Sequence, residues 1–157
     1  MRNLVERLKD VGDLIDSGQI DKAYSDLDDL IKDYPTRAEP LIIASQHSLE
    51  IHQLEKAKNY IKKAVSINPN NIDTLKFAGI IYNAASEHHD ALEYFSKCVS
   101  LGCKDSDLLL KQANSYVKLL KPAPAKLILD HLRSIRKITP RGLVDLATCV
   151  QYMNQGI

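Results

Sequence analysis

The sequence predicts an all-α fold built from a repeated pair of helices. Small residues recur at an interval of 34 residues: Ala23, Ala57, Ala91 and Ala125. A bulky apolar residue lies four places beyond each of them: Leu27, Ile61, Phe95 and Leu129. Two prolines, Pro35 and Pro69, keep the same interval. This recurrence predicts a repeat protein in which each unit packs only on its neighbours, and it covers nearly the whole chain.

The repeating unit is best seen between Leu75 and Phe95. One apolar helix face has the spacing i, i+3, i+4, i+7: Leu75, Ala78, Gly79 and Tyr82. After a polar break at residues 86–89, a second face follows: Ala91, Leu92, Phe95 and Val99. Small residues in both helices, Gly79 and Ala91, would let the two backbones approach closely.

This pattern resembles the tetratricopeptide repeat, a 34-residue pair of helices. Gly79, Tyr82, Ala91 and Phe95 match the family pattern, whereas Leu75 replaces its usual Trp. The resemblance implies a right-handed superhelical solenoid of helix-turn-helix repeats. It also implies a concave groove lined by the first helix of each repeat.

The interval divides the chain, taken as a single domain over 1–157, into four units and a closing helix. Their predicted ranges are 4–37, 38–71, 72–105, 106–139 and, for the closing helix, 140–154. The first unit departs from the family pattern at Arg7, Asp10 and Val11, as expected for a terminal repeat with one face lacking a neighbour. Gly18 should end its first helix, and Ile20 to Asp33 should form the second.

The closing helix should begin at Thr139 as N-cap with Pro140 in the first helical position. Five apolar residues outline its packing face: Leu143, Val144, Leu146, Ala147 and Val150. In many arrays of this family a single extra helix covers the last apolar face. The same residues also fit the first helix of a fifth unit, and the sequence does not separate these two interpretations.

Composition indicates a water-soluble globular chain. It has 157 residues, 45% hydrophobic, and a formal charge of +1, so no bulk attraction to nucleic acid or membrane is implied. No secretory signal or 18-residue apolar run is found, and three cysteines lack CxxC spacing. We therefore expect a cytoplasmic protein that does not bind membranes.

Charge is uneven along the chain. Residues 1–37 hold 6 Lys/Arg and 9 Asp/Glu, a net charge of −3, and residues 106–157 hold 8 and 3, a net charge of +5. The most basic stretch, residues 131–141, has no aromatic residues among its charges. This favours a solvated basic end over a nucleic-acid site.

The sequence predicts no catalytic activity and no cofactor. The motifs GxSxG, GxGxxG and HExxH and the P-loop are all absent. The best candidate for a metal site is His88 with His89, but adjacent helical residues point about 100° apart. These residues are better read as the exposed first turn of a helix. Cys98 takes a small-residue position at the helix interface and should be buried and inert.

The resemblance also places the groove. The carboxylate clamp of chaperone-binding members needs Lys at position five and Asn at position nine of one unit. Here Lys76 is followed by Ile80, and Asn114 is preceded by Leu110, so the clamp is absent. The predicted groove residues are apolar with a few polar groups between them: Leu8, Ile15, Ile42, Gln46, Leu49, Lys76, Ile80, Asn83, Leu110, Asn114 and Val117.

These observations predict a non-catalytic scaffold that binds a protein partner, as a peptide or helix segment, in the groove. No small-molecule substrate is expected. Two alternatives stay open. One is that the chain is the N-terminal array of a longer bacterial enzyme resembling a sulfotransferase or glycosyltransferase. The other is that it assembles with itself as a homo-oligomer, through the groove or through the closing helix.

Overall fold

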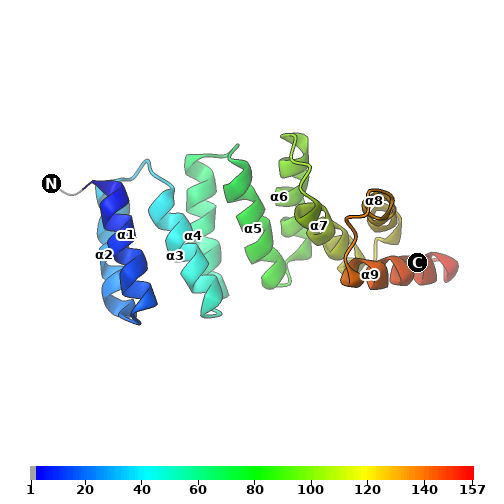
Figure 1. Cartoon of the computed structure of the whole chain (residues 1–157), viewed down its shortest axis with the longest axis horizontal. Coiled ribbons are helices and arrows are strands. Elements are labelled where there is room, and N and C mark those ends of the chain that lie inside the picture. The colour runs from blue at the N-terminus through cyan, green and yellow to red at the C-terminus, as the bar shows by residue number, and fades with distance from the viewer. Residues whose placement is uncertain (1–2) are drawn as a thin grey trace. The chain divides into compact units, whose positions relative to one another are not determined.

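The computed structural model describes residues 3–157, and this part of the chain is helical with no strand (Figure 1). The all-α prediction is confirmed. The helices in order are α1 (Leu4–Asp16), α2 (Ile20–Asp33), α3 (Glu39–Glu50), α4 (Leu54–Ile67), α5 (Ile72–Ala84), α6 (His88–Ser100), α7 (Ser106–Lys118), α8 (Pro122–Ser134) and α9 (Pro140–Asn154). Successive pairs from α1 to α8 fill the four predicted units, and α9 coincides with the predicted closing helix.

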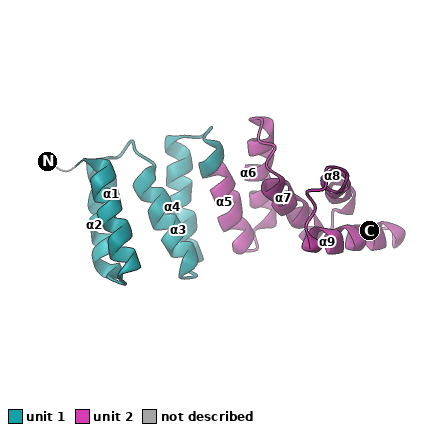
Figure 2. Cartoon of the chain, in the orientation of Figure 1, with its two compact units in different colours: residues 1–74 teal, residues 75–157 magenta. Residues whose placement is uncertain are grey.

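The chain forms two compact units (Figure 2). Unit 1 extends to Thr74, and unit 2 runs from Leu75 to Ile157. The division falls within the first turn of α5, so unit 1 holds two helix pairs and unit 2 holds the rest of α5 with α6 to α9.

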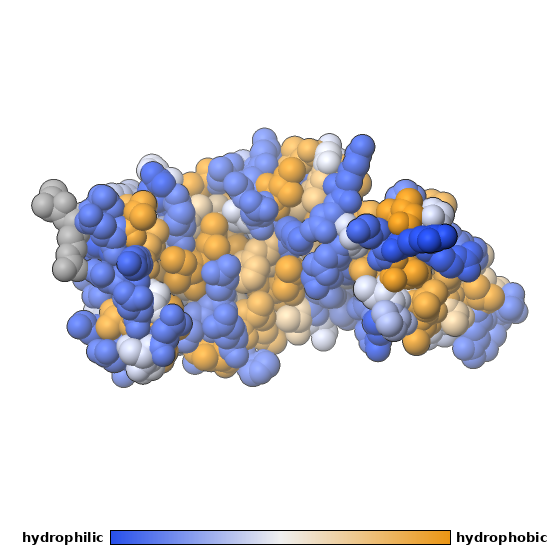
Figure 3. All heavy atoms as spheres, viewed as in Figure 1, coloured by the Kyte–Doolittle hydropathy of each residue, from blue (hydrophilic) through white to orange (hydrophobic). Residues whose placement is uncertain are grey.

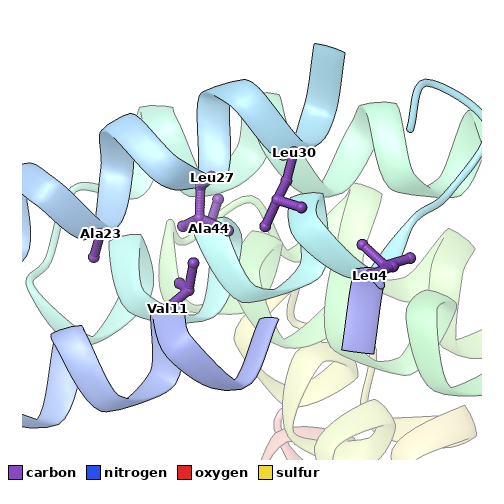
Figure 4. Close-up of a cluster of buried hydrophobic side chains, with 6 residues drawn as sticks. All are labelled: Leu4, Val11, Ala23, Leu27, Leu30 and Ala44. Carbon is purple, nitrogen blue, oxygen red and sulfur yellow. The ribbon is translucent and has the colours of Figure 1, made fainter. Parts of the chain in front are cut away.

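The core of unit 1 joins its first three helices. The buried side chains of this cluster are Leu4 and Val11 from α1, Ala23, Leu27 and Leu30 from α2, and Ala44 from α3 (Figure 4). Arg7 takes the place of the family's large apolar residue and ties α1 to α2 instead, with Nη1 2.6 Å from Asp33 Oδ2. The terminal repeat thus replaces an apolar contact with a surface ion pair.

Buried polar groups in unit 1 are paired with one another. The Tyr24 hydroxyl of α2 lies 2.9 Å from Ser48 Oγ and 3.1 Å from His47 Nδ1, both on α3. The two rings meet edge to face, with centroids 5.4 Å apart. Because His47 and Ser48 are buried, these hydrogen bonds offset the cost of removing them from water.

Helices α5 and α6 of unit 2 are in close contact at Gly79. A Cβ atom at this position would lie 2.4 Å from Cε1 of Phe95, and the three nearest atoms all belong to the Phe95 ring. Phe95 itself is fully buried. The glycine is therefore required by the Phe95 ring. That Gly79 and Ala91 together let the two backbones approach closely stays a prediction.

The turn within each helix pair uses one left-handed residue, again at an interval of 34: Gly18, His52, Ser86 and Leu120. Each turn has the same two backbone hydrogen bonds, for example Gly18 N to Ile15 O and Gln19 N to Leu14 O. This is the Schellman ending of a helix, which normally selects glycine. Gly18 and the polar break that begins at Ser86 were predicted from the sequence, whereas His52 and Leu120 carry no such signal.

The packing face predicted for α9 is largely wrong. Leu146 is buried as expected, but Leu143, Val144, Ala147 and Val150 are exposed. The buried face is instead Gly142, Asp145, Leu146 and Cys149. The apolar stripe was read as the side that contacts the preceding helices, whereas it lies on the other side of α9.

Asp105 connects the start of α7 to α5. Its Oδ1 accepts a hydrogen bond of 3.0 Å from the Asp107 backbone nitrogen and so caps α7, while Oδ2 accepts from Lys76 Nζ. Lys76 holds the pKa of Asp105 below its ordinary value, and Asp105 in turn raises the pKa of Lys76. One carboxylate therefore fixes both the end of a helix and a cation on its neighbour.

We predict that Gly79→Ala lowers the free energy of unfolding by about 1–3 kcal/mol, because the new methyl group overlaps the buried Phe95 ring. Gly12→Ala is the matched control: it lies within α1, and a Cβ there meets nothing within 4 Å. That change should raise stability by up to about 1 kcal/mol. Urea unfolding followed by circular dichroism measures both. A Gly79→Ala effect that persists unchanged in a Phe95→Leu background would contradict the ring contact.

We predict that Leu120→Gly stabilises the protein by up to about 1 kcal/mol. Leu120 is half exposed with φ +54°, a conformation that costs an L residue roughly 1–2 kcal/mol, partly offset by the entropy that glycine loses on folding. Lys63→Gly, at an exposed position within α4, should instead destabilise by roughly 1 kcal/mol. The two melting temperatures should move in opposite directions, and a fall in both would show that the Leu120 backbone is not strained.

We predict that the Asp105–Lys76 pair contributes stability that disappears in acid. Since the folded pKa of Asp105 is lowered from 3.8, its contribution is complete above that pH and is lost as the pH falls through the folded value. Asp105→Asn keeps a good N-cap but removes the charge. Its urea midpoint should lie below that of the wild type at about pH 7 and converge with it at about pH 2. A difference that is constant with pH would contradict this account.

Candidate functional site

Unit 2 contains a cavity of about 500 Å³ bordered by α5, α7 and α9. Its lining residues are Asn83, Asp107, Leu110, Lys111, Asn114, Thr139, Arg141, Gly142 and Asp145. Three of the predicted groove residues therefore lie together on one concave surface: Asn83, Leu110 and Asn114.

Gly142 lets α9 approach α7 closely enough to form this cavity. A Cβ there would lie 2.9 Å from both Leu110 Cδ2 and Ile138 Cγ1, so only glycine fits without a shift. The start of α9 is fixed by Thr139, whose Oγ1 accepts a 3.1 Å hydrogen bond from the Gly142 nitrogen. The predicted N-cap is confirmed, and it places Arg141 beside the cavity.

Asn83 is held at the cavity wall by two neighbours. Its Oδ1 accepts a hydrogen bond of 3.2 Å from Ser115 Oγ and lies 2.6 Å from His88 Nδ1. Burial, with Lys118 nearby, lowers the pKa of His88 and so favours the neutral ring. In the neutral ring, the Nδ1–H group donates a hydrogen bond to Asn83 Oδ1. Since the oxygen of Asn83 is engaged, its amide nitrogen is the group that it can offer to a ligand.

Asp145 is a buried carboxylate beneath the cavity, 5% exposed. Its Oδ2 accepts a 3.2 Å hydrogen bond from Asn114 Nδ2, and its Oδ1 lies 3.5 Å from Arg141 Nε. The side chain of Arg141 is 70% exposed, so the outer guanidinium nitrogens face solvent. Asp145 thus orients one amide and one cation, leaving the Asn114 carbonyl oxygen and the Arg141 donors for a ligand.

The other predicted groove residues of unit 2 have different surroundings. Lys76 is bound to Asp105, and Asp107 lies 3.9 Å away. Ile80 is half-buried, and Val117 packs against the core that includes Ala113, Leu129 and Cys149. These three residues are not among those that line the cavity.

In unit 1 the predicted residues are mostly part of the packing. Leu8 and Ile15 pack against the core cluster of α1 to α3. Ile42 and Leu49 are half-buried, and Gln46 is exposed. A role of these five residues in binding stays a prediction.

Sequence reasoning missed Lys111, Arg141 and Asp145 as site residues. Arg141 had a usable signal: it is position two of a fifth unit if the 34-residue count is continued from Ser106 to Pro140. Its spacing of four from Asp145 also predicts an ion pair along one helix face. Because only four repeats were counted, α9 was not included in the predicted groove.

Residues 3–157 contain no group of three or more His, Cys, Asp or Glu side chains that could hold a metal ion. Within the same residues, no helix has the length and hydrophobicity needed to cross a membrane. Cys98 is buried, as predicted.

No family model matches the sequence, and no curated protein matches it. Solved structures do. A tetratricopeptide repeat protein from Parabacteroides merdae matches with a TM-score of 0.82 at 17% identity, over 96% of this chain and 60% of its own. MamA matches with a TM-score of 0.85 at 15% identity, over 96% and 82%. YrrB, described as a TPR protein with an unusual peptide-binding site, matches with a TM-score of 0.68 at 20% identity, over 79% and 64%.

This chain spans three fifths of the Parabacteroides protein, and all three identities are low enough that the likeness concerns architecture. The paired helices, the interval of 34 residues and these matches agree with one another. The chain has the tetratricopeptide repeat fold.

Proposed function

We propose that this protein is a non-catalytic interaction scaffold that binds a segment of a partner protein in the cavity of unit 2. The observation that carries the proposal is the cavity itself, which combines one apolar side chain, Leu110, with polar groups held in fixed positions around it. Such a surface suits peptide binding better than catalysis, because its lining residues do not combine a nucleophile with a general base. The fold shared with YrrB, which has a peptide-binding site, supports the same proposal.

The lining residues suggest how a segment is held. Leu110 accepts an apolar side chain of the ligand, since it is half-buried at the cavity wall. The Asn83 amide nitrogen and the Asn114 carbonyl oxygen offer one donor and one acceptor, the pair that a peptide backbone unit requires. Lys111 and Arg141 lie at the rim, paired with Asp107 at 3.6 Å and with Asp145 at 3.5 Å, and their remaining N–H donors favour acceptor groups of the segment.

The expected cytoplasmic location belongs to this proposal. Cys98, Cys103 and Cys149 form no disulfide within residues 3–157, and Cys98 and Cys149 are buried. Reduced cysteines of this kind fit a reducing compartment.

We predict that replacing cavity residues weakens peptide binding without unfolding the protein. Peptides selected from a display library on the wild-type chain should bind Asn83→Ala more weakly by about 1–2 kcal/mol, as for a central contact, and Lys111→Ala more weakly by less than that, because Lys111 lies at the rim. Lys62→Ala on α4 and Glu93→Ala on α6 are controls, because both side chains are exposed and lie outside the cavity. Fluorescence anisotropy gives the affinities, and thermal unfolding checks each variant.

A selected peptide that binds both cavity variants with wild-type affinity would contradict the proposal. Loss of affinity in the two controls, with the cavity variants unaffected, would place binding on the second helices instead. A variant that loses affinity and also melts early would be replaced by Asn114→Ser, which keeps a hydrogen-bonding group near Asp145.

A further inference from the structure

Helix α9 carries an apolar face that nothing in the described chain covers. This outer face consists of Leu143, Val144, Ala147, Val150 and Met153. Leu143 is 49% and Val144 59% exposed, although residues of this type are usually removed from water. Figure 3 shows hydrophobic side chains at the surface over this end of unit 2. An uncovered apolar stripe of this length indicates a contact surface.

The other first helices show what such a face normally does. In α5, the residues at positions four, seven and eight of the unit, Leu75, Ala78 and Gly79, are buried. In α9 the same positions are Leu143, Leu146 and Ala147, of which only Leu146 is buried. The outer face of α9 therefore has the composition of a helix-packing surface, and no helix among residues 3–157 follows it as α6 follows α5.

We propose that the outer face of α9 pairs with the same face of a second copy of this chain, with the two helices antiparallel. The sizes of the residues fit this symmetry. Ala147 is the small residue at the centre, with Leu143 four residues before it and Val150 three residues after it. When two such helices cross at Ala147, Leu143 of each meets Val150 of the other, and the small residues allow close approach.

The charges of α9 fit the same arrangement. Its two charged residues, Arg141 and Asp145, lie 3.5 Å apart at their nearest atoms, and Asp145 is buried. The remainder of the helix, from Leu146 to Asn154, is uncharged, so no like charges meet across the pair. A strongly acidic partner would gain nothing along this uncharged stripe.

The size of the face predicts a weak dimer. A 15-residue helix is about 22 Å long, and one helix pair lies at the low end of the areas buried by specific interfaces. Association should therefore be measured up to high protein concentration. Sedimentation of the full chain should show a shift from 17.6 kDa toward 2 × 17.6 = 35.2 kDa as concentration rises.

A double variant, Leu143→Glu with Val150→Glu, tests the face. It should raise the dissociation constant of the dimer at least about tenfold, because four carboxylates would then meet in the contact. Leu127→Glu is the matched control: Leu127 is 75% exposed on α8, outside the proposed face, and its change should leave the dimer unaffected. Both variants alter exposed positions, and circular dichroism checks that they stay folded.

Cysteine crosslinking tests the geometry. In a Cys103→Ser background, Ala147→Cys should form an intermolecular disulfide readily, because the two-fold axis brings these positions together. Ala123→Cys, exposed on α8, should not. The proposal is overturned by a chain that remains at 17.6 kDa at every concentration, by a dimer that survives Leu143→Glu with Val150→Glu, or by equal crosslinking at residues 147 and 123. A chain that stays monomeric would assign the face to another helix, from a different protein or a further segment.

Discussion

The fold of both units depends on small residues that keep paired helices close. Ala23, Ala57, Ala91 and Ala125 are all completely buried, and so are the bulky residues four places later in three of the four pairs, with Leu27 at 1% exposure. An added methylene at such a crossing has no space to enter, since interiors are packed as densely as organic crystals. Gly79 shows the limit of this constraint, because even one carbon atom would overlap the Phe95 ring. The 34-residue interval therefore reflects the same steric requirement in each helix-pair repeat.

This requirement explains why the helices could be predicted from the sequence. The predicted ranges Ile20 to Asp33 and 140–154 match α2 and α9 residue for residue. The left-handed residue of each turn was harder to predict from the sequence. His52, Ser86 and Leu120 adopt the left-handed conformation although none is glycine. Packing of the two helices on either side fixes these turns, so the local residue type no longer has to, and a signal based on residue type misses them.

The candidate site was predictable only in part, for a related reason. Position counting along first helices identified Asn83, Leu110 and Asn114, which do line one cavity. The same counting predicted Lys76 as a groove residue, because it cannot show that Asp105 both caps α7 and binds this lysine. Hydrogen bonds between neighbouring repeats depend on turn geometry that the periodicity does not determine. Arg141 and Asp145 were missed because they belong to α9, which lies beyond the fourth repeat.

Helix α9 shows that a periodic apolar stripe predicts a contact surface but does not identify what packs against it. Its stripe was read as facing inward, yet Gly142 and Asp145 face α7 and the cavity, while Leu143, Ala147 and Val150 are exposed. The two faces belong to one short rigid helix whose N-terminal turn holds Arg141 beside the cavity. A contact made on the outer face therefore restrains the same turn that positions this cation. In a paired chain, self-association and ligand binding would use the same helix, and each would change the free energy of the other to the extent that pairing moves Arg141.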